Sequence, residues 1–277
     1  TLAAWGFNRL SLGVQDLDPE VQHLIGRHQT EEQTRVLYEY ARELGFRSIN
    51  FDLIYGLPGQ TDVTIEATLD AIVAMRPDRL AVYSFAFVPW MRPHQHRIDE
   101  STLPQPMDKL ALFAGVANRL MAADYRRIGM DHFALPDDDL ALAAATRTLS
   151  RNFMGYTTGI SAEVIALGSS GISDIGGAYA QNHRRLASYY QAVDGGSLPI
   201  ERGYRLDADD LLRREVITEI MCNGEVDLAA AAERHGADFD SFSEEIRLLL
   251  AAGGLVEEGL AVLRGSEVGV TELGSPF

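Results

Sequence analysis

Residues 47–55, RSINFDLIY, form a dense run of β-branched, aromatic and other apolar residues, which ends at the turn residues Leu57-Pro58-Gly59. Such a run is typical of a strand that is buried on both faces of a sheet. A helical pattern over residues 62–75 and a second apolar run over residues 80–86 follow it. This alternation predicts parallel βαβ units, and therefore an α/β fold, rather than a helical bundle or a sandwich.

The same alternation extends toward the N-terminus. There we expect a strand over residues 10–15 and helices over residues 19–26 and 31–44. Toward the C-terminus the alternation weakens, and residues 87–103, which contain Pro89 and Pro93, predict a long loop. Beyond the loop we expect helices over residues 107–123 and 137–149, a short strand over 126–133, and irregular structure over 151–158 and 164–177.

From about residue 205 three helical segments precede an alternation of apolar and polar residues, a layout similar to that of a winged helix. No basic recognition helix accompanies it, so we do not expect DNA binding there. We therefore predict two domains, residues 1–204 with the later strands of a partial parallel (β/α) barrel and residues 205–277 as a small helical C-terminal domain. The expected helices span residues 208–221, 228–235 and 239–252, and a hairpin spans residues 255–263 and 266–271.

The composition is that of an ordinary globular protein, with 46% hydrophobic and 23% charged residues among 277. A net charge of −16 argues against nucleic acid or an anionic membrane as the main partner, and no apolar run predicts a membrane span. The chain starts with Thr1 rather than Met, and we expect it to be part of a longer polypeptide. Its single cysteine, Cys222, indicates a reducing compartment, which is the cytoplasm, and cannot hold an iron–sulfur cluster alone.

Two expected strands carry polar residues that could bind a ligand. Gln15 ends the segment NRLSLGVQD (residues 8–16), at the edge where parallel barrels bind ligands. A buried strand with a polar end is the alternative there. Asp52 lies within the apolar strand of NFDLIYGLPGQT (residues 50–61) and needs partners if it is buried. It is suited to binding ribose hydroxyls, unless it pairs with a nearby arginine or with the backbone.

The segment VPWMRPHQHR (residues 88–97) gathers Arg92, His94, His96 and Arg97 in an otherwise acidic chain. This cluster would suit a ligand with several carboxylates, although a chance charged loop is the alternative. No third ligand lies near the two histidines, so we do not predict a metal site there.

Asp131 and His132 are adjacent and could form an acid/base pair or a structural contact. Arg27 alone indicates only a solvated or capping side chain at a helix end. No nucleophile elbow, Walker A, Rossmann fingerprint or CxxC motif is present. The residues by themselves therefore predict a partial barrel whose strand ends bind a nucleotide-like ligand beside a polyacid.

In order, these segments resemble the oxygen-independent coproporphyrinogen III oxidase family along nearly the whole chain. NRLSLGVQD and NFDLIYGLPGQT are shared with its near relatives, whereas GMDHFALPDD (residues 129–138), RNFMGYTT (151–158) and AYAQN (178–182) are more specific to the oxidase. The resemblance implies a radical S-adenosylmethionine enzyme with a 4Fe–4S cluster. It also implies that a deoxyadenosyl radical starts the conversion of two propionates of coproporphyrinogen III to the vinyl groups of protoporphyrinogen IX.

The resemblance also implies roles for individual residues. Gln15 is similar to a contact of S-adenosylmethionine at a strand end, and Arg27 to the cationic partner of its carboxylate or of a substrate propionate. Asp52 resembles the acid that holds the ribose hydroxyls, and Ala86 a backbone contact at the end of the next strand. Ile172 resembles an apolar contact to the adenosyl group.

The family's CxxxCxxC segment is absent, so the resemblance implies that the cluster ligands lie upstream and that this chain alone is inactive. It further implies an external electron donor, and we expect a monomer. Two alternatives remain open. One is the radical-type haem chaperone, which shares the first two segments but differs where this chain has GMDHFA. The other is a truncated, non-catalytic paralogue.

Overall fold

The computed structural model describes residues 2–153, 155–159 and 163–275. The chain folds into two compact units, of which unit 1 ends at Ala145 and unit 2 begins at Thr146. The predicted boundary after residue 204 stays a prediction. None of the helices in the described residues is both long and apolar enough to cross a membrane.

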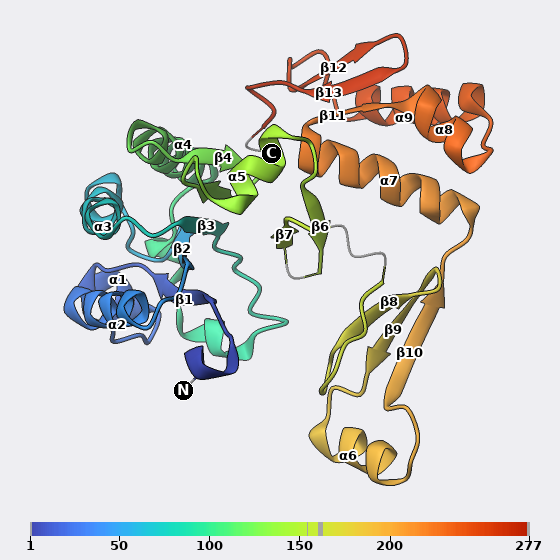
Figure 1. The fold of residues 1–277 in the computed structure, drawn as a ribbon. Coiled ribbons are helices and arrows are strands. Elements are labelled where there is room, and N and C mark those ends of the chain that lie inside the picture. The colour runs from blue at the N-terminus through green and yellow to red at the C-terminus, as the bar shows by residue number, and fades with distance from the viewer. Residues whose placement is uncertain (1, 154, 160–162, 276–277) are drawn as a thin grey trace. The chain divides into compact units, whose positions relative to one another are not determined.

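Unit 1 is built on an open sheet of order β1-β2-β3-β5-β4 with helices on one side (Figure 1). β1 (Arg9–Gln15), β2 (Ser48–Tyr55) and β3 (Arg79–Ser84) pair in parallel, which confirms the predicted βαβ units. β5 (His132–Ala134) and β4 (Arg126–Ile128) extend the sheet in the antiparallel sense. The helices are α1 (Pro19–Leu24), α2 (Glu31–Glu43), α3 (Asp62–Met75), α4 (Pro106–Ala122) and α5 (Asp139–Ala145), with 3-10 turns η1 (Ala3–Trp5), η2 (Pro93–Arg97) and η3 (Glu100–Thr102).

Local sequence signals fix where the crossover helices begin. Thr30 and Thr61 each start a capping box, in which the threonine hydroxyl accepts a hydrogen bond from the backbone N–H three residues on. Asp18 caps α1 in a similar way, with Pro19 at the first helical position. The chain therefore turns from β1 into α1 and from β2 into α3 over short loops, and the parallel strands β1, β2 and β3 end at the same edge of the sheet.

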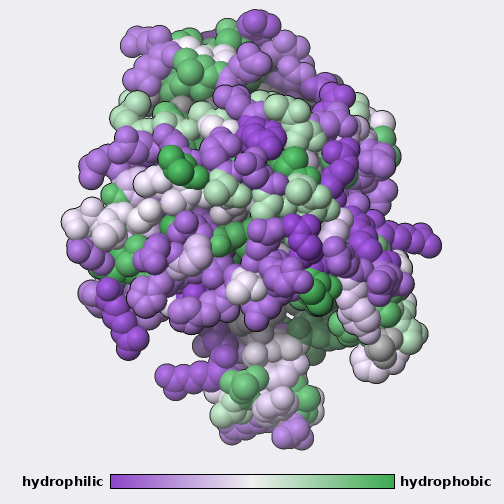
Figure 2. Space-filling model, turned by 90° about the vertical axis from the view of Figure 1, so that its left-hand side faces the viewer, coloured by the Kyte–Doolittle hydropathy of each residue, from purple (hydrophilic) through white to green (hydrophobic). Residues whose placement is uncertain are grey.

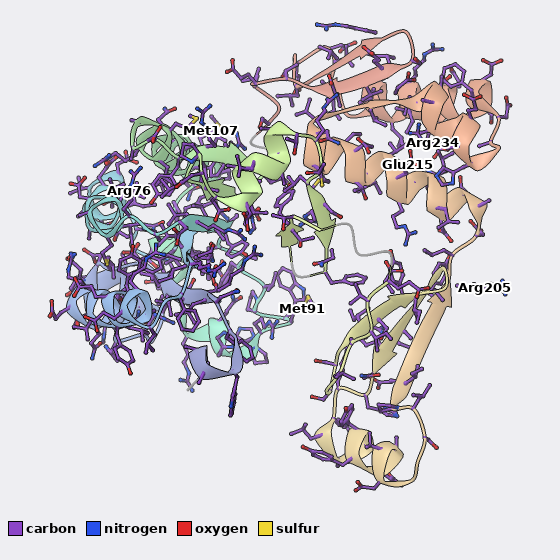
Figure 3. The ribbon with its side chains drawn as sticks, viewed as in Figure 1. Arg76, Met91, Met107, Arg205, Glu215 and Arg234 are labelled. Carbon is purple, nitrogen blue, oxygen red and sulfur yellow. The ribbon has the colours of Figure 1, made fainter. Side chains whose placement is uncertain are left out.

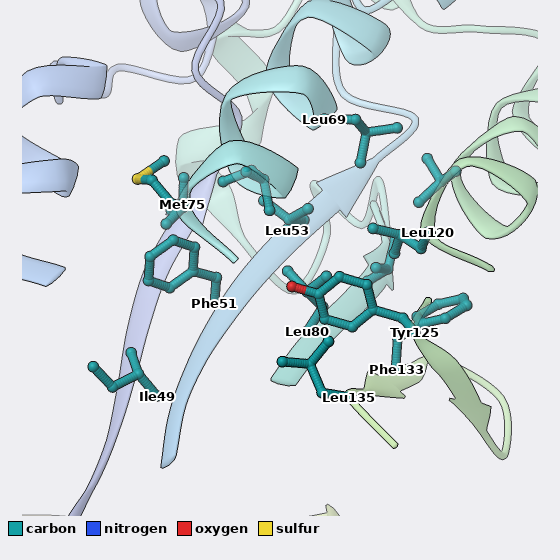
Figure 4. Close-up of a cluster of buried hydrophobic side chains, with 14 of the residues drawn as sticks. Ile49, Phe51, Leu53, Leu69, Met75, Leu80, Leu120, Tyr125, Phe133 and Leu135 are labelled. Atoms are coloured by element: carbon teal, nitrogen blue, oxygen red, sulfur yellow. The ribbon is translucent and has the colours of Figure 1, made fainter. Parts of the chain in front are cut away.

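The core of unit 1 lies between the sheet and its helices (Figure 4). Alternate residues of β2 (Ile49, Phe51 and Leu53) point into it and are at most 4% exposed. Leu69 and Met75 of α3, with Leu120 of α4, pack against them. The other residues of these strands face the opposite side of the sheet, because side chains alternate along a strand. The helix-covered side of unit 1 is mainly hydrophilic, with small separate apolar patches (Figure 2).

The described residues of unit 2 form three small sheets. A hairpin of β6 (Ser150–Asn152) and β7 (Gly155–Thr157) comes first, and β8 (Ile172–Ile175), β9 (Ala178–Asn182) and β10 (Ile200–Arg205) form an antiparallel sheet next to α6 (Leu186–Asp194). The predicted winged-helix layout then follows, with three helices and a sheet of order β11-β13-β12. Its elements are α7 (Ala208–Asn223), β11 (Glu225–Asp227), α8 (Leu228–His235), α9 (Phe239–Ala252), β12 (Ala261–Arg264) and β13 (Glu267–Val270).

The winged-helix part has its own core and surface ion pairs. Leu212, Val216 and Phe242 are among its buried residues. Glu215 of α7 accepts hydrogen bonds from Arg234 and from His235 of α8, and Figure 3 shows the Glu215 and Arg234 side chains side by side. These contacts join α7 to α8.

Five predictions of local structure were wrong. The hairpin arm expected over residues 255–263 is a strand only in β12 (Ala261–Arg264), because residues 253–259 form turns. The expected strand over residues 126–133 is a pair of strands, because Gly129 adopts a φ of +67° and turns the chain. The helix expected over residues 137–149 is only α5 (Asp139–Ala145), and Ser150 already belongs to β6. Residues 151–158 contain the β6–β7 hairpin, and residues 164–177, which were expected to be irregular, contain β8. Residues 154 and 160–162 lie outside the described residues.

Candidate functional site

The carboxyl end of β1 contains a bulge. Pairing with β2 shifts between Gly13 and Gln15, so Gly13 lies opposite Asp52 and Gln15 lies opposite Leu53. Gln15 adopts a left-handed backbone with a φ of +70°. This conformation is unfavourable for a residue other than glycine, and such strain is concentrated at functional positions. The sequence predicted a polar residue at this strand end. The structure adds that the left-handed backbone of Gln15 sets the direction of its side chain.

The Gln15 side chain folds back over Gly13. A Cβ atom placed on Gly13 would lie 2.8 Å from Nε2 of Gln15, so the amide would have to move if residue 13 carried a side chain. Within the described residues, the Gln15 amide has no hydrogen-bond partner. Because Gly13 is paired with Asp52, the amide lies on the side of the sheet that also carries the Asp52 carboxylate.

Asp52 belongs to a small polar cluster on the side of the sheet opposite the helices. Its carboxylate accepts hydrogen bonds from Asn50 Nδ2 at 2.7 Å and from Ser11 Oγ at 3.2 Å. Asn50 Nδ2 also donates to Ser11 Oγ at 2.9 Å. Asp52 thus pairs with neither an arginine nor the backbone among the described residues, contrary to the structural alternative. Ser11 and Asn50 were missed, although their alternation with apolar neighbours places them on the Asp52 side.

Arg27 reaches back from the end of α1 to this bulge. Its Nη2 donates to the Gly13 carbonyl and, at 2.5 Å, to Gln29 Oε1. Its Nε is buried and has no hydrogen-bond partner within the described part of the chain. The interpretation of Arg27 as a merely solvated or capping side chain is therefore wrong, because the guanidinium is half-buried against the strand end.

Asp16 fixes the ends of β1 and β2 beneath the bulge. It is fully buried and accepts hydrogen bonds from the Asp18 backbone N–H, from Thr68 Oγ1 and from Gln60 Nε2, at 2.7, 2.8 and 2.6 Å. Gln60 also accepts from the Gly56 N–H and donates to the Ile54 carbonyl. Burial raises the pKa of Asp16, although these hydrogen bonds counteract the rise. The two strand ends are therefore joined by one buried polar network.

The chain that leaves β3 is held by two side chains from later elements. Gln95, which is 7% exposed, donates to the Ala86 carbonyl at 3.0 Å and accepts from the Val88 N–H at 2.6 Å. Lys109 donates to the Phe85 carbonyl at 2.5 Å, and burial lowers the pKa of this ammonium. The exposed Ala86 keeps a backbone N–H that bonds to nothing in the described chain. The Ala86 N–H is thus a hydrogen-bond donor held in a fixed position two residues after the end of β3.

The remaining predicted positions lie in the exposed loop after β3, beside β3, or in unit 2. Arg92, His94, His96 and Arg97 are all exposed in and beside η2, and Gln95 is the residue of that turn that points inward. His132 Nδ1 lies 2.6 Å from Asp131 Oδ1, and its ring also meets Tyr83 edge-on. Ile172 is the first residue of β8 in unit 2, whereas the other four predicted site residues are in unit 1.

The edge of the unit 1 sheet offers complementary groups for a polar ligand. Asp52 and the amide oxygen of Gln15 accept hydrogen bonds, and Arg27, the Gln15 amide and the Ala86 N–H donate them. The neighbouring parallel strands bring Gln15 next to Asp52, and Ala86 follows two residues after the end of β3. Such an arrangement can bind a nucleoside that carries a carboxylate. Among the described residues, no group of three His, Cys, Asp or Glu side chains could hold a metal ion.

Comparison with known proteins gives consistent matches. The sequence profile of the Radical SAM superfamily matches residues 1–72, and that of the HemN C-terminal domain matches residues 206–277. The oxygen-independent coproporphyrinogen III oxidase of Thermostichus vulcanus is 45% identical over 268 residues, which are 95% of this chain and 82% of that protein. The enzyme of the same name from Pseudomonas aeruginosa is 47% identical over 241 residues, 87% of this chain and 52% of that protein.

A solved structure is similar as well. It is that of coproporphyrinogen III oxidase from Escherichia coli, described as a radical SAM enzyme, and it matches with a TM-score of 0.93 at 42% identity. The match covers 99% of this chain and 63% of the Escherichia coli chain. This chain therefore spans about half to three fifths of the length of the Pseudomonas and Escherichia coli proteins.

Proposed function

The chain belongs to the oxygen-independent coproporphyrinogen III oxidase family, and we propose that it carries part of the S-adenosylmethionine site and the substrate-binding segments of such an enzyme. The reaction is the oxidative decarboxylation of two propionates of coproporphyrinogen III to vinyl groups, without oxygen. The observation that carries the proposal is the strained bulge that holds the Gln15 amide beside Asp52. It is a built polar site in a chain that is similar to the oxidases almost throughout.

The residues at the sheet edge fit S-adenosylmethionine. Asp52 can accept hydrogen bonds from both ribose hydroxyls, and the Ala86 N–H can donate to a ring nitrogen of the adenine. Arg27 and Gln15 can donate to the methionyl carboxylate, with Arg27 also suited to a substrate propionate. The buried Nε of Arg27 and Oδ1 of Asn50, which lack partners within the described residues, support a ligand at this edge. Ile172 keeps its proposed role as an apolar contact to the adenosyl group.

The chain does not fit an iron–sulfur cluster. Cys222 is its single cysteine, and burial raises the pKa of this thiol, which disfavours the thiolate that a cluster needs. We propose that the 4Fe–4S ligands lie upstream of residue 1 and that this chain alone is inactive, so no residue here is assigned to the cluster. When bound, S-adenosylmethionine supplies the hydrogen-abstracting chemistry, and the residues of this chain hold and orient it.

The substrate must be bound against the charge of the protein. Coproporphyrinogen III carries four carboxylates, whereas the chain has a net charge of −16. The exposed residues Arg92, His94, His96 and Arg97 form a local basic loop just after Ala86 and can attract these carboxylates. We further propose an external electron donor, a monomeric enzyme and a cytoplasmic location, the last because the single thiol is typical of a reducing compartment.

The proposal is tested with the enzyme expressed from the complete reading frame, assayed without oxygen at matched iron content. We expect wild-type protein to form protoporphyrinogen IX. Arg27→Ala should weaken S-adenosylmethionine binding about 10- to 100-fold in equilibrium dialysis, because a hydrogen bond to a charged group contributes about 1.5–3 kcal/mol. Arg27→Lys should recover little of this, since an ammonium does not replace a two-pronged guanidinium.

The matched control is Arg47→Ala, which removes the same charge from an exposed position just before β2, at the opposite end of the strand from the site. It should leave both binding and turnover unchanged. Wild-type enzyme without product would refute the proposed reaction. Unchanged binding by Arg27→Ala would show that Arg27 serves only to hold the Gly13 carbonyl.

A further inference from the structure

The β8–β9–β10 sheet of unit 2 gathers several distinctive side chains on one of its sides. Ile172 of β8 and Arg202 of β10 are both paired with Gln181 of β9, so the three side chains form one row across the sheet. In the next row on the same side, Tyr179 lies between Asp174 and Tyr204. We call the side formed by Ile172, Asp174, Tyr179, Gln181, Arg202 and Tyr204 the Arg202 face.

Arg202 is held in place without an acidic partner. Its Nε donates to Gln181 Oε1 at 2.8 Å, and Gln181 in turn donates through Nε2 to the Ser170 carbonyl at 3.3 Å. No carboxylate of the described residues pairs with Arg202, which is exposed. By contrast, the nearby Arg213 and Arg214 each pair with an acid. In a chain with a net charge of −16, Arg202 is thus a positioned guanidinium whose terminal nitrogens can bind a carboxylate.

Aromatic side chains lie next to this guanidinium. Phe153 of the segment after β6 meets Tyr179 edge-on, with ring centroids 5.2 Å apart. Phe153 is 61% exposed and Tyr204 is 58% exposed, although aromatic rings of this size are usually covered. The Tyr204 hydroxyl donates a hydrogen bond to the Asp210 carboxylate at 3.0 Å, and the Asp174 carboxylate forms an ion pair with Arg214. Both acids near the face therefore already have partners. The face therefore combines apolar ring surface with one available positive charge.

We infer that the Arg202 face binds the tetrapyrrole substrate, with Arg202 receiving one propionate carboxylate and the aromatic rings contacting the pyrroles. This inference rests on the proposed function and assigns it a substrate-binding surface. Charge complementarity favours this occupant, because the molecule is both ring-rich and a tetracarboxylate. Two of the segments on which the resemblance to the oxidase rests, RNFMGYTT and AYAQN, supply Phe153, Tyr179 and Gln181 to the same surface.

The test is a fluorescence titration of the full chain with coproporphyrin III, the stable oxidised tetracarboxylate, and with its tetramethyl ester, which has no negative charge. We expect Arg202→Gln to raise the dissociation constant for the acid about tenfold or more, because a bidentate charged contact is lost. Binding of the ester should change little. Arg202→Lys should behave nearly like Arg202→Gln, because a point charge does not replace the guanidinium fork.

The control is Arg205→Gln on the same strand. Arg205 is exposed, points to the opposite side of the sheet because it is an odd number of residues from Arg202, and extends away from the neighbouring strands in Figure 3. It should bind coproporphyrin III within about twofold of wild type, since surface substitutions away from a site have small effects. Circular dichroism and a melting curve confirm that each variant is folded.

The outcomes separate the two levels of the proposal. Wild-type chain that binds neither porphyrin would refute the substrate class proposed for this chain, and the inference with it. Binding by wild type that Arg202→Gln leaves unchanged would overturn the Arg202 face alone. An equal loss in Arg202→Gln and Arg205→Gln would show a general charge effect and would likewise overturn it.

Discussion

The buried network around Asp16 makes a prediction that does not depend on the function. Replacing Asp16 with alanine removes the acceptor of three hydrogen bonds, from the Asp18 N–H, Thr68 Oγ1 and Gln60 Nε2. All three donors would remain in a place that water does not reach, because Asp16 is fully buried. We therefore expect Asp16→Ala to loosen the carboxyl ends of both β1 and β2.

The magnitude follows from the number and kind of these bonds. Hydrogen bonds to a charged group contribute about 1.5–3 kcal/mol each, so three of them would contribute about 4.5–9 kcal/mol. Removing a buried carboxylate also relieves its desolvation, which offsets several kcal/mol of that loss. The free energy of unfolding should thus fall by about 3 kcal/mol, a large part of the 5–15 kcal/mol that is usual for a domain.

The measurement is urea unfolding at neutral pH, combined with hydrogen exchange of the β1 and β2 amides, which reports on unit 1 specifically. Glu39→Ala, which removes an exposed acid from α2, is the control and should change stability by less than about 0.5 kcal/mol. Asp16→Ala and Gln60→Ala should be non-additive by about 1 kcal/mol or more, because they share one bond. A cost below about 1 kcal/mol for Asp16→Ala, or strictly additive effects, would refute the network.

Three further predictions concern the same strand end. Gly13→Ala should change the free energy of unfolding by less than about 1 kcal/mol. It should nevertheless weaken S-adenosylmethionine binding about tenfold in dialysis, because the new Cβ would lie 2.8 Å from the Gln15 amide. Normal affinity would contradict this. Gln15→Val should be about 1–2 kcal/mol less stable to urea than Gln15→Asn, since a β-branched residue fits a φ of +70° poorly whereas asparagine tolerates it; equal stability of the two would argue against strain. Burial raises the pKa of Asp16 above its ordinary 3.8, so the part of its contribution to stability that depends on protonation is complete below about pH 4 and is lost as the pH rises through the folded-state pKa. The stability of wild type relative to Asp16→Asn should consequently decline in urea titrations between pH 4 and pH 7, and an increase would show that the carboxylate is favoured when charged.

Much of unit 1 could be predicted from sequence because its strands and helices carry strong periodic signals. The apolar run at residues 47–55 and the helical pattern at 62–75 correspond to β2 and α3 within one residue. The parallel order followed from their alternation, and Gln15 and Asp52 were placed on neighbouring strands for the same reason. Their roles toward a ligand stay predictions.

Other features depend on contacts between distant segments and left little local signal. The register shift at Gly13 appears only when β1 is paired with β2. Asp16 gains its importance from Gln60 and Thr68, which are 44 and 52 residues away. β8, β9 and β10 were missed because they are short and poorly buried, so they show no alternation of apolar and polar residues; every residue of β10 is exposed.

Lys109 is the only lysine among the 277 residues, since the other 23 of the 24 Lys and Arg residues are arginines. Its amine can therefore be modified selectively among the side chains. Its ammonium bonds to the Phe85 carbonyl and lies 5.9 Å from the Tyr55 ring centroid, beside the segment that leads to Ala86. Since burial lowers its pKa, a larger fraction is uncharged and nucleophilic near neutral pH than for an ordinary lysine. An acylating dye would therefore mark one lysine side chain of this chain at a known place, beside the exit of β3.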